Sequence, residues 1–240
     1  MAVGLLPAAG MARRLGISHP KELLGFEGRP VIDYALDHLV EAGVDALVVV
    51  IRPGKEAVAE HVAARRLGPQ LVVAEQDGEI GNLLDGVRAG LRVASGQDVL
   101  LAFPDTFTAP NPFRAARRGE LLLLCHDAGP LWRQFGVLDP AAGVVVEKAP
   151  AELTAPPSTL CWGAASWSPA FSARLTEPAT ATVTEAINAV RWEHALTIER
   201  YVDIGIGIGI GIGIGLGPDA APPGGRRLGA GRGVERAPAG

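Results

Sequence analysis

The fold of this chain is decided by residues 30–51, which read PVIDYALDHLVEAGVDALVVVI. Apolar residues in the first part recur every three or four positions, which predicts a helix over 30–41 that ends before Gly43. The following run, 46–51, is almost entirely apolar and rich in valine, as in a strand that is buried on both faces. A helix followed at once by such a strand is typical of a parallel α/β sheet.

The same alternation extends in both directions along the chain. We predict further strands over 3–7, 71–74 and 99–103, and further helices over 54–64 and 80–93. Strand and helix therefore alternate through the first hundred residues, which predicts a doubly wound, mostly parallel sheet. In such sheets ligands bind beyond the carboxyl ends of the strands, where residues 7–20 and 104–107 would lie.

The pattern changes after Asp105. Strands are predicted over 120–126, 160–167 and 196–204, and a hairpin is predicted from the pair 135–139 and 144–147. The sequence Thr182-Val-Thr-Glu185 is a capping box that predicts a helix through Val190.

Composition and charge exclude several classes of protein. The 240 residues carry a formal charge of −4, whereas non-specific nucleic-acid binders usually have a basic excess. Two cysteines, Cys125 and Cys161, are too few for a disulfide-stabilised secreted fold, and the five histidines show no metal-binding spacing. Residues 1–10 have no basic region and only a short apolar stretch, so we expect no signal peptide, and no apolar run is long enough to span a membrane. We therefore expect a cytoplasmic protein without nucleic-acid or membrane partners.

The end of the chain has a different composition from the rest. Residues 204–240 hold 13 of the 31 glycines, and residues 204–217 alternate isoleucine, finally leucine, with glycine. Glycine at every second position weakens a strand and leaves its register poorly specified. We expect a folded domain over 1–203, a Gly-Ile repeat over 204–217 and a disordered tail rich in Gly, Pro and Arg over 218–240.

Three stretches near the N-terminus resemble the nucleotide-binding motifs of the sugar nucleotidylyltransferases, in particular the glucose-1-phosphate thymidylyl- and uridylyltransferases. They are LPAAGMARRL at 6–15, PKELL at 20–24 and GRPVIDY at 28–34. Later family landmarks follow in the family's order: FPDT at 103–106, FG at 135–136, EKAP at 147–150, WG at 162–163 and YVDIG at 201–205. The resemblance covers about residues 2–205.

This resemblance implies a Rossmann-like α/β fold of the nucleotide-diphospho-sugar transferase type, with a small β-hairpin insertion that binds the sugar. It implies transfer of a nucleotidyl group, with dTTP or UTP favoured, to a sugar-1-phosphate, which gives an NDP-sugar and pyrophosphate. Because two anions must be brought together, positive charge and positioning should dominate the catalysis.

The resemblance also assigns residues to the nucleotide. The backbone of Ala8, Ala9 and Gly10 would approach the phosphates, while Arg14 would hold the pyrophosphate and Lys21 would neutralise charge at the α-phosphate. Gln76 and Gly81 match the base-reading positions in spacing and type, and a glutamine amide can both donate to and accept from a pyrimidine. Taken alone, Arg14 and Lys21 could be solvated loop charges, and Gln76 could be a surface glutamine before a turn.

The remaining assignments concern the metal and the sugar. Asp105 and Asp203 match the family's metal-binding pair, and two carboxylates suit Mg²⁺, which retains water and bridges phosphates. The sugar phosphate would be bound by four residues: Gly136, Glu147, Lys148 and Gly163. Simple turn or strand-end roles are the alternatives for both acids, and a solvated hairpin is the alternative for Glu147.

Two departures from the family pattern leave alternatives open. Ala12 and Arg13 replace the usual glycine and threonine of the loop, and the Gly-Ile repeat replaces helices that often support homo-oligomers in the family. A cytidylyl- or guanylyltransferase acting on another phosphorylated metabolite is one alternative. A non-catalytic module that binds nucleotides or sugar phosphates is the other.

Overall fold

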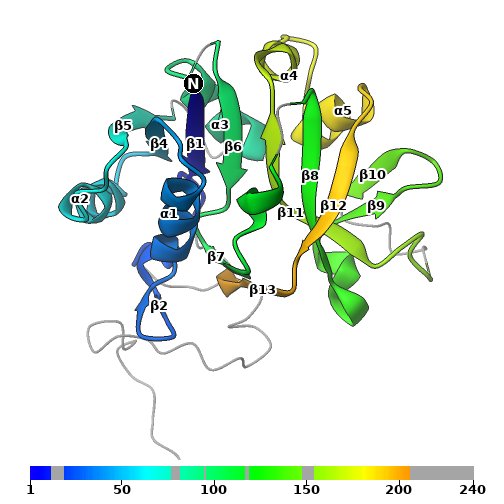
Figure 1. Ribbon diagram of the computed structural model, residues 1–240, viewed down its shortest axis with the longest axis horizontal. Helices are drawn as coiled ribbons and strands as arrows, with labels where there is room; N and C mark the ends of the chain where they lie inside the picture. The colour runs from blue at the N-terminus through cyan, green and yellow to red at the C-terminus, as the bar shows by residue number, and fades with distance from the viewer. Residues whose placement is uncertain (12–18, 77–81, 95, 117–118, 148–153, 206–240) are drawn as a thin grey trace, which may run out of the picture.

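The first half of the chain forms the parallel part of a nine-stranded mixed sheet (Figure 1). The computed structural model describes residues 1–11, 19–76, 82–94, 96–116, 119–147 and 154–205. Four strands lie side by side in the order β5-β4-β1-β6, all parallel: β1 (Ala2–Pro7), β4 (Ala46–Ile51), β5 (Gln70–Glu75) and β6 (Asp98–Ala102). The predicted strands at these four places are confirmed, and β4 has the predicted bounds.

Helices cover both faces of this sheet. On one face, α1 (Ile32–Glu41) and α2 (Glu56–Ala64) bury apolar side chains such as Leu36 and Val58 against the strands. On the other face, α3 (Leu83–Leu91) packs together with α4 (Pro169–Leu175) and α5 (Val183–Asn188). The doubly wound α/β fold is therefore confirmed.

The second half of the chain extends the sheet with antiparallel pairing. Strand β11 (Leu160–Trp167) pairs with β6 on one side and with β8 (Leu121–Asp127) on the other, both antiparallel. Strand β12 (Glu193–Ile198) then runs parallel to β8. The predicted hairpin is present as β9 (Gly136–Asp139) and β10 (Val144–Glu147), which pair antiparallel beside the start of β11.

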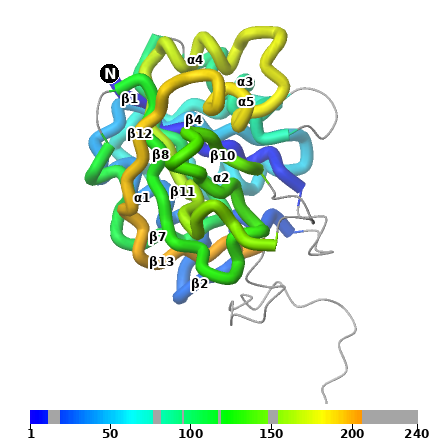
Figure 2. The backbone as a smooth tube through the Cα atoms, turned by 90° about the vertical axis from the view of Figure 1, so that its right-hand side faces the viewer, coloured from blue at the N-terminus to red at the C-terminus, as the bar shows by residue number. Residues whose placement is uncertain are grey.

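Small elements complete the fold. Among the described residues they are the short pair β2 (Gly25–Phe26) and β3 (Arg29–Pro30), the pair β7 (Thr106–Ala109) and β13 (Arg200–Asp203), and the 3₁₀ helices η2 (Lys21–Leu23), η3 (Pro112–Ala115) and η4 (Gly129–Gln134). Figure 2 shows β13 and β7 at the same end of the molecule as β2. Among the described residues, no helix has the length and apolar character needed to cross a membrane.

The single last strand predicted over 196–204 is wrong, because the chain divides there into β12 and β13. Between them, the N–H of Glu199 donates to the carbonyl of Ala109 at 2.9 Å, which turns the chain away from β8 toward β7. An apolar run of this kind shows that a segment is extended, but it does not show which partner strand the segment pairs with.

Helix boundaries also differ from the predictions. Pro30 belongs to β3, so α1 begins two residues later, and α5 ends at Asn188. The Thr182 hydroxyl accepts from the N–H of Glu185 at 3.0 Å, but the Glu185 carboxylate accepts from Ala181. The predicted capping box is therefore only half formed.

Part of the predicted repeat belongs to the folded unit. Ile204 is fully buried in a small core with Leu24, Phe26, Val31 and Phe107. Residues 206–240, which hold the rest of the predicted repeat and the predicted tail, lie outside the described residues.

Candidate functional site

The carboxyl ends of the parallel strands surround a cavity of about 200 Å³. Its walls come from the segments that follow β1, β4, β5 and β6, as expected for a parallel α/β sheet. Polar lining residues are Lys21, Arg52, Gln76, Asn82 and Asp105, and the backbone of Ala9 and Gly10 completes the wall.

Lys21 and Asp105 form an ion pair at this cavity. Lys21 Nζ donates to Asp105 Oδ2, and the two side chains are 22% and 13% exposed. Burial alone would lower the pKa of Lys21, but the negative charges of Asp105, Glu22 and Asp203 outweigh burial and raise that pKa. Lys21 is therefore a fixed positive charge at neutral pH.

Asp203 comes to the same place from the end of the described chain. Strand β13 pairs with β7, and the N–H of Ile204 donates to the carbonyl oxygen of Asp105 at 3.1 Å. Asp203 also adds to the negative field that raises the pKa of Lys21. The structure thus brings together three residues that the sequence predicts for one site, Lys21, Asp105 and Asp203.

The chemistry of these oxygen donors fits Mg²⁺. The described residues contain no cluster of three or more His, Cys, Asp or Glu side chains that could hold a metal by themselves. A pair of carboxylates beside a cationic cavity suits an ion that takes its remaining ligands from water and from substrate phosphates.

Lys55 and Glu22 form a buried ion pair behind the cavity that the sequence analysis missed. Lys55 Nζ donates to Glu22 Oε1 at 2.7 Å and to the carbonyl oxygen of Ala8 at 2.8 Å. Burial lowers the pKa of Lys55 and raises the pKa of Glu22, and their mutual attraction opposes both changes. The only sequence signal was a lysine directly after Pro53-Gly54, which resembles an ordinary surface turn.

Gln76 occupies a position suited to reading a bound group. Its side chain is buried, lines the cavity, and its backbone N–H donates to Ile51 at 2.8 Å. A Cβ on Gly86 would lie 3.3 Å from Gln76 Oε1, so the small residue in α3 leaves room for this amide. Arg52, directly after β4, is a second cavity residue that the sequence analysis missed.

Three predicted site residues, Arg14, Gly81 and Lys148, lie outside the described residues. Ala8 is fully buried, and its N–H donates to Val50 at 2.8 Å, so its backbone continues the parallel ladder by one residue.

The predicted sugar-binding glycines each accommodate an aromatic ring. A Cβ on Gly136 would lie 2.6 Å from Trp162 Nε1, and a Cβ on Gly163 would lie 2.5 Å from the ring of Tyr201. Trp162 in turn packs on Phe103 of the cavity wall, with ring centroids 5.4 Å apart. These two glycines are therefore required by packing, whether or not a sugar approaches them.

Glu147 lies on the hairpin opposite Gly136 and accepts a hydrogen bond from the Thr184 hydroxyl of α5. The Asn188 side chain binds Val145 of the same strand, accepting from its N–H at 2.7 Å and donating to its carbonyl at 2.9 Å. Helix α5 thus fixes the hairpin that carries Glu147.

Tyr201 of β13 is held between Gly163 and His126. Its ring stacks on the imidazole with centroids 4.0 Å apart and planes 1° apart. His126 is 3% exposed, and burial lowers its pKa to about 4. This stack packs against β13, the strand that carries Asp203.

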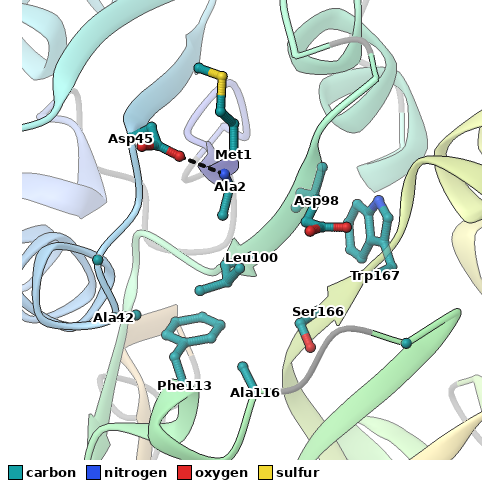
Figure 3. A pocket seen from close by; sticks show the side chains of 13 residues that line it. Met1, Ala2, Ala42, Asp45, Asp98, Leu100, Phe113, Ala116, Ser166 and Trp167 are labelled. Atoms are coloured by element: carbon teal, nitrogen blue, oxygen red, sulfur yellow. Dashed lines mark hydrogen bonds between the residues drawn. The ribbon is translucent and has the colours of Figure 1, made fainter.

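A larger cavity of about 450 Å³ lies at the opposite, amino-terminal edge of the sheet (Figure 3). It is lined by Met1, Leu100 and Trp167 and by the carboxylates Asp45 and Asp98, with no Lys or Arg among its described lining residues. Anionic phosphates favour the smaller cavity, where the cations are.

The fold of this chain is shared with solved structures of nucleotide-diphospho-sugar transferases. A UDP-glucose pyrophosphorylase from Acinetobacter baumannii superimposes with a TM-score of 0.69 at 19% identity, over 85% of this chain and 88% of that one. A protein from Bacillus anthracis assigned as a glucose-1-phosphate thymidylyltransferase gives a TM-score of 0.74 at 13% identity, over 88% and 94%.

Sequence comparison gives a family match over part of the chain. Residues 4–116 match the MobA-like NTP transferase domain, and the resemblance to sugar nucleotidylyltransferases is confirmed. A 2-C-methyl-D-erythritol 4-phosphate cytidylyltransferase from Rhodococcus jostii is 38% identical over 120 residues, half of each chain. The bifunctional protein GlmU of Gluconacetobacter diazotrophicus is 32% identical over 125 residues, 52% of this chain and 24% of that one. The matched region thus spans half the length of these curated relatives or less.

Proposed function

We propose that this protein transfers a nucleotidyl group from a nucleoside triphosphate to a phosphorylated acceptor and releases pyrophosphate. The observation that carries the proposal is the convergence of Lys21, Asp105 and Asp203 beside a cavity at the carboxyl edge of the sheet. The match to an NTP transferase domain over residues 4–116 supports the same activity.

In the proposed reaction an oxygen of the acceptor phosphate attacks the α-phosphorus. A new P–O bond forms, the bond from the α-phosphorus to the bridging oxygen breaks, and pyrophosphate leaves with the electron pair. Lys21 and Arg14 neutralise charge on the phosphates, and the backbone of Ala9 and Gly10, which follows Ala8, shapes their binding site. The residues provide charge and position, and no covalent intermediate on the protein is required.

Asp105 and Asp203 would hold Mg²⁺, which supplies electrophilic charge to phosphate oxygens when it is bound. Tyr201 and the β7–β13 pair keep the two carboxylates together. We expect calorimetry to detect Mg²⁺ binding to the resting protein, and we expect this binding to weaken strongly in Asp203→Asn.

We propose dTTP or UTP as the nucleotide and a sugar-1-phosphate as the acceptor. Gln76 and Gly81 would read the base, and Gly136, Glu147, Lys148 and Gly163 would line the acceptor site. The fold shared with UDP-glucose and glucose-1-phosphate enzymes supports this specificity.

Transfer of a cytidylyl group to a different sugar or polyol phosphate is the second candidate. It is favoured by four curated cytidylyltransferases acting on 2-C-methyl-D-erythritol 4-phosphate, which are 36–40% identical to this chain over 92 to 120 residues.

One assay separates these candidates. The protein is incubated with Mg²⁺, each of dTTP, UTP, CTP and GTP, and either glucose-1-phosphate or 2-C-methyl-D-erythritol 4-phosphate, and pyrophosphate release is recorded. Release only with dTTP or UTP and the hexose phosphate supports the first specificity, and release only with CTP supports the second. Binding of nucleotide without release in any combination would refute the transferase and leave a binding module.

A further inference from the structure

One buried ammonium group joins three separate segments at the carboxyl edge of the sheet. Lys55 is 8% exposed, and its Nζ donates to the carbonyl of Ala8 after β1 and to the carboxylate of Glu22 in η2. Its own backbone N–H donates to the carbonyl of Arg52 at 3.1 Å, which closes the turn after β4.

Each of these segments carries a group of the cavity. Ala8 precedes Ala9 and Gly10, Glu22 directly follows Lys21, and Arg52 itself lines the cavity. The side chains of Lys55 and Glu22 do not belong to the described lining of the cavity. They can therefore act on a bound ligand only through the groups that they hold in place.

Stability alone does not account for this buried pair. Removing two charges from water costs about as much as their attraction returns, so a well-packed apolar pair would serve a purely structural purpose equally well. Glu22 is 1% exposed, and its second oxygen, Oε2, is buried without a hydrogen-bond partner among the described residues. An apolar side chain, however, cannot donate to the carbonyl of Ala8.

We propose that Lys55 and Glu22 are positioning residues, which hold the loop at Ala8–Gly10 against Lys21 in the conformation that binds the triphosphate. This inference deepens the proposed function and rests on it. It assigns a role in binding the nucleoside triphosphate to two side chains that do not touch the nucleotide.

The test uses four variants of the full chain: Lys55→Met, Glu22→Gln, the double variant Lys55→Met/Glu22→Leu, and the control Arg114→Met. Lys55→Met leaves Glu22 buried without its partner, so its Tm should fall by on the order of 10 °C. The double variant removes both charges and should regain most of that loss. Arg114 pairs with Glu41 on an exposed surface away from the cavity. Its substitution should change neither the Tm nor the KM for the triphosphate.

Positioning predicts that recovered stability does not restore nucleotide binding. In the double variant the KM for the triphosphate should remain roughly tenfold above wild type, because the hydrogen bond from a charged donor to Ala8 is lost. Glu22→Gln keeps an acceptor for Lys55 and with it the bond to Ala8, so its KM should lie close to wild type. A double variant with both the Tm and the KM of wild type would overturn the proposal.

Hydrogen exchange of the backbone over residues 8–11, measured without nucleotide, gives a readout that does not depend on turnover. Faster exchange in Lys55→Met than in Glu22→Gln supports positioning, even if the double variant fails to fold, and equal exchange in these two variants overturns it. If wild type released no pyrophosphate with any triphosphate, the proposed function would fail while this exchange result still decided whether Lys55 holds the loop.

Discussion

In the first half of the chain four parallel strands end at one edge, whereas in the second half β8, β9, β10 and β11 meet their neighbours mainly in antiparallel fashion. Most of the described charges around the small cavity follow strands of the first half: Lys21, Arg52, Lys55 and Asp105. The second half adds one acid, Asp203, and a set of packed aromatic rings.

The two halves of the chain suit two different tasks. Parallel strands bring the ends of successive segments to one edge and so concentrate charge there, which suits the handling of phosphates. An antiparallel sheet with a hairpin provides shape rather than charge, which suits the recognition of a second substrate. The match to the NTP transferase domain over residues 4–116 lies almost wholly within the first half.

The largest effect is expected at Asp105, which follows β6 in the first half and pairs with Lys21. Asp105→Asn keeps the size of the side chain but removes the charge that pairs with Lys21, so turnover should fall by about 10²- to 10³-fold while the fold persists. Pyrophosphate release and thermal unfolding check both parts. Asp45→Asn, at the opposite edge of the sheet, is the matched control and should keep full activity. Unchanged turnover in Asp105→Asn would remove Asp105 from the site.

Burial of His126 in the second half of the chain should make the stability of the protein depend on pH. Because burial lowers the pKa of His126 to about 4, the unfolded chain binds a proton there below pH 6.5 while the folded chain does not. Stability should therefore decline as the pH falls from 6.5 to 4, by about 3 kcal/mol from this residue. Urea unfolding of wild type and His126→Phe at pH 7, 5 and 4 measures the difference. Parallel stability curves for the two proteins would contradict the assignment.

The aromatic packing can be tested at a glycine. In Gly163→Ala the new methyl group would lie 2.5 Å from the Tyr201 ring, so we expect a loss of roughly 1–3 kcal/mol in the free energy of unfolding. Gly68→Ala is the control, since no heavy atom lies within 4 Å of its Cβ position. Equal stability of the two variants would show that Tyr201 adjusts without cost.

The smallest effects are expected on KM, and a substitution in each half of the chain should affect a different substrate. Gln76→Leu should raise the KM for the triphosphate by roughly tenfold, and Glu147→Ala should raise the KM for the acceptor by a similar factor, because each would remove one of the proposed hydrogen bonds to a substrate. Steady-state kinetics with each substrate varied in turn measures both. A rise in the KM of the same substrate in both variants would show that the halves do not divide the tasks.

The sequence predicted the first half of the fold well, because a parallel strand buried on both faces leaves a plain apolar run such as 46–51. It did not predict β7 or the division of the last strand. At Thr106–Ala109 the apolar run is short, and its pairing with β13 depends on a segment nearly a hundred residues away. Pairing over such a distance leaves no local pattern.

The residues of the candidate site were also predicted only in part. Lys21, Asp105 and Asp203 were predicted from motifs, and the structure places them together. Lys55 could not be predicted, because its bond to Ala8 depends on how β1 and β4 lie side by side. The packing reason for Gly163 also needed the structure, since the ring that fills its space belongs to β13.

The buried position of Ile204 has a consequence for how this sequence could vary. The side chain that closes the small core directly after Asp203 is the first isoleucine of an alternating Ile-Gly tract. Insertion or deletion of whole Ile-Gly units restores isoleucine at position 204 and glycine at position 205. The length of the tract can therefore change without moving Asp203, which lies opposite Thr106 in the β7–β13 pair.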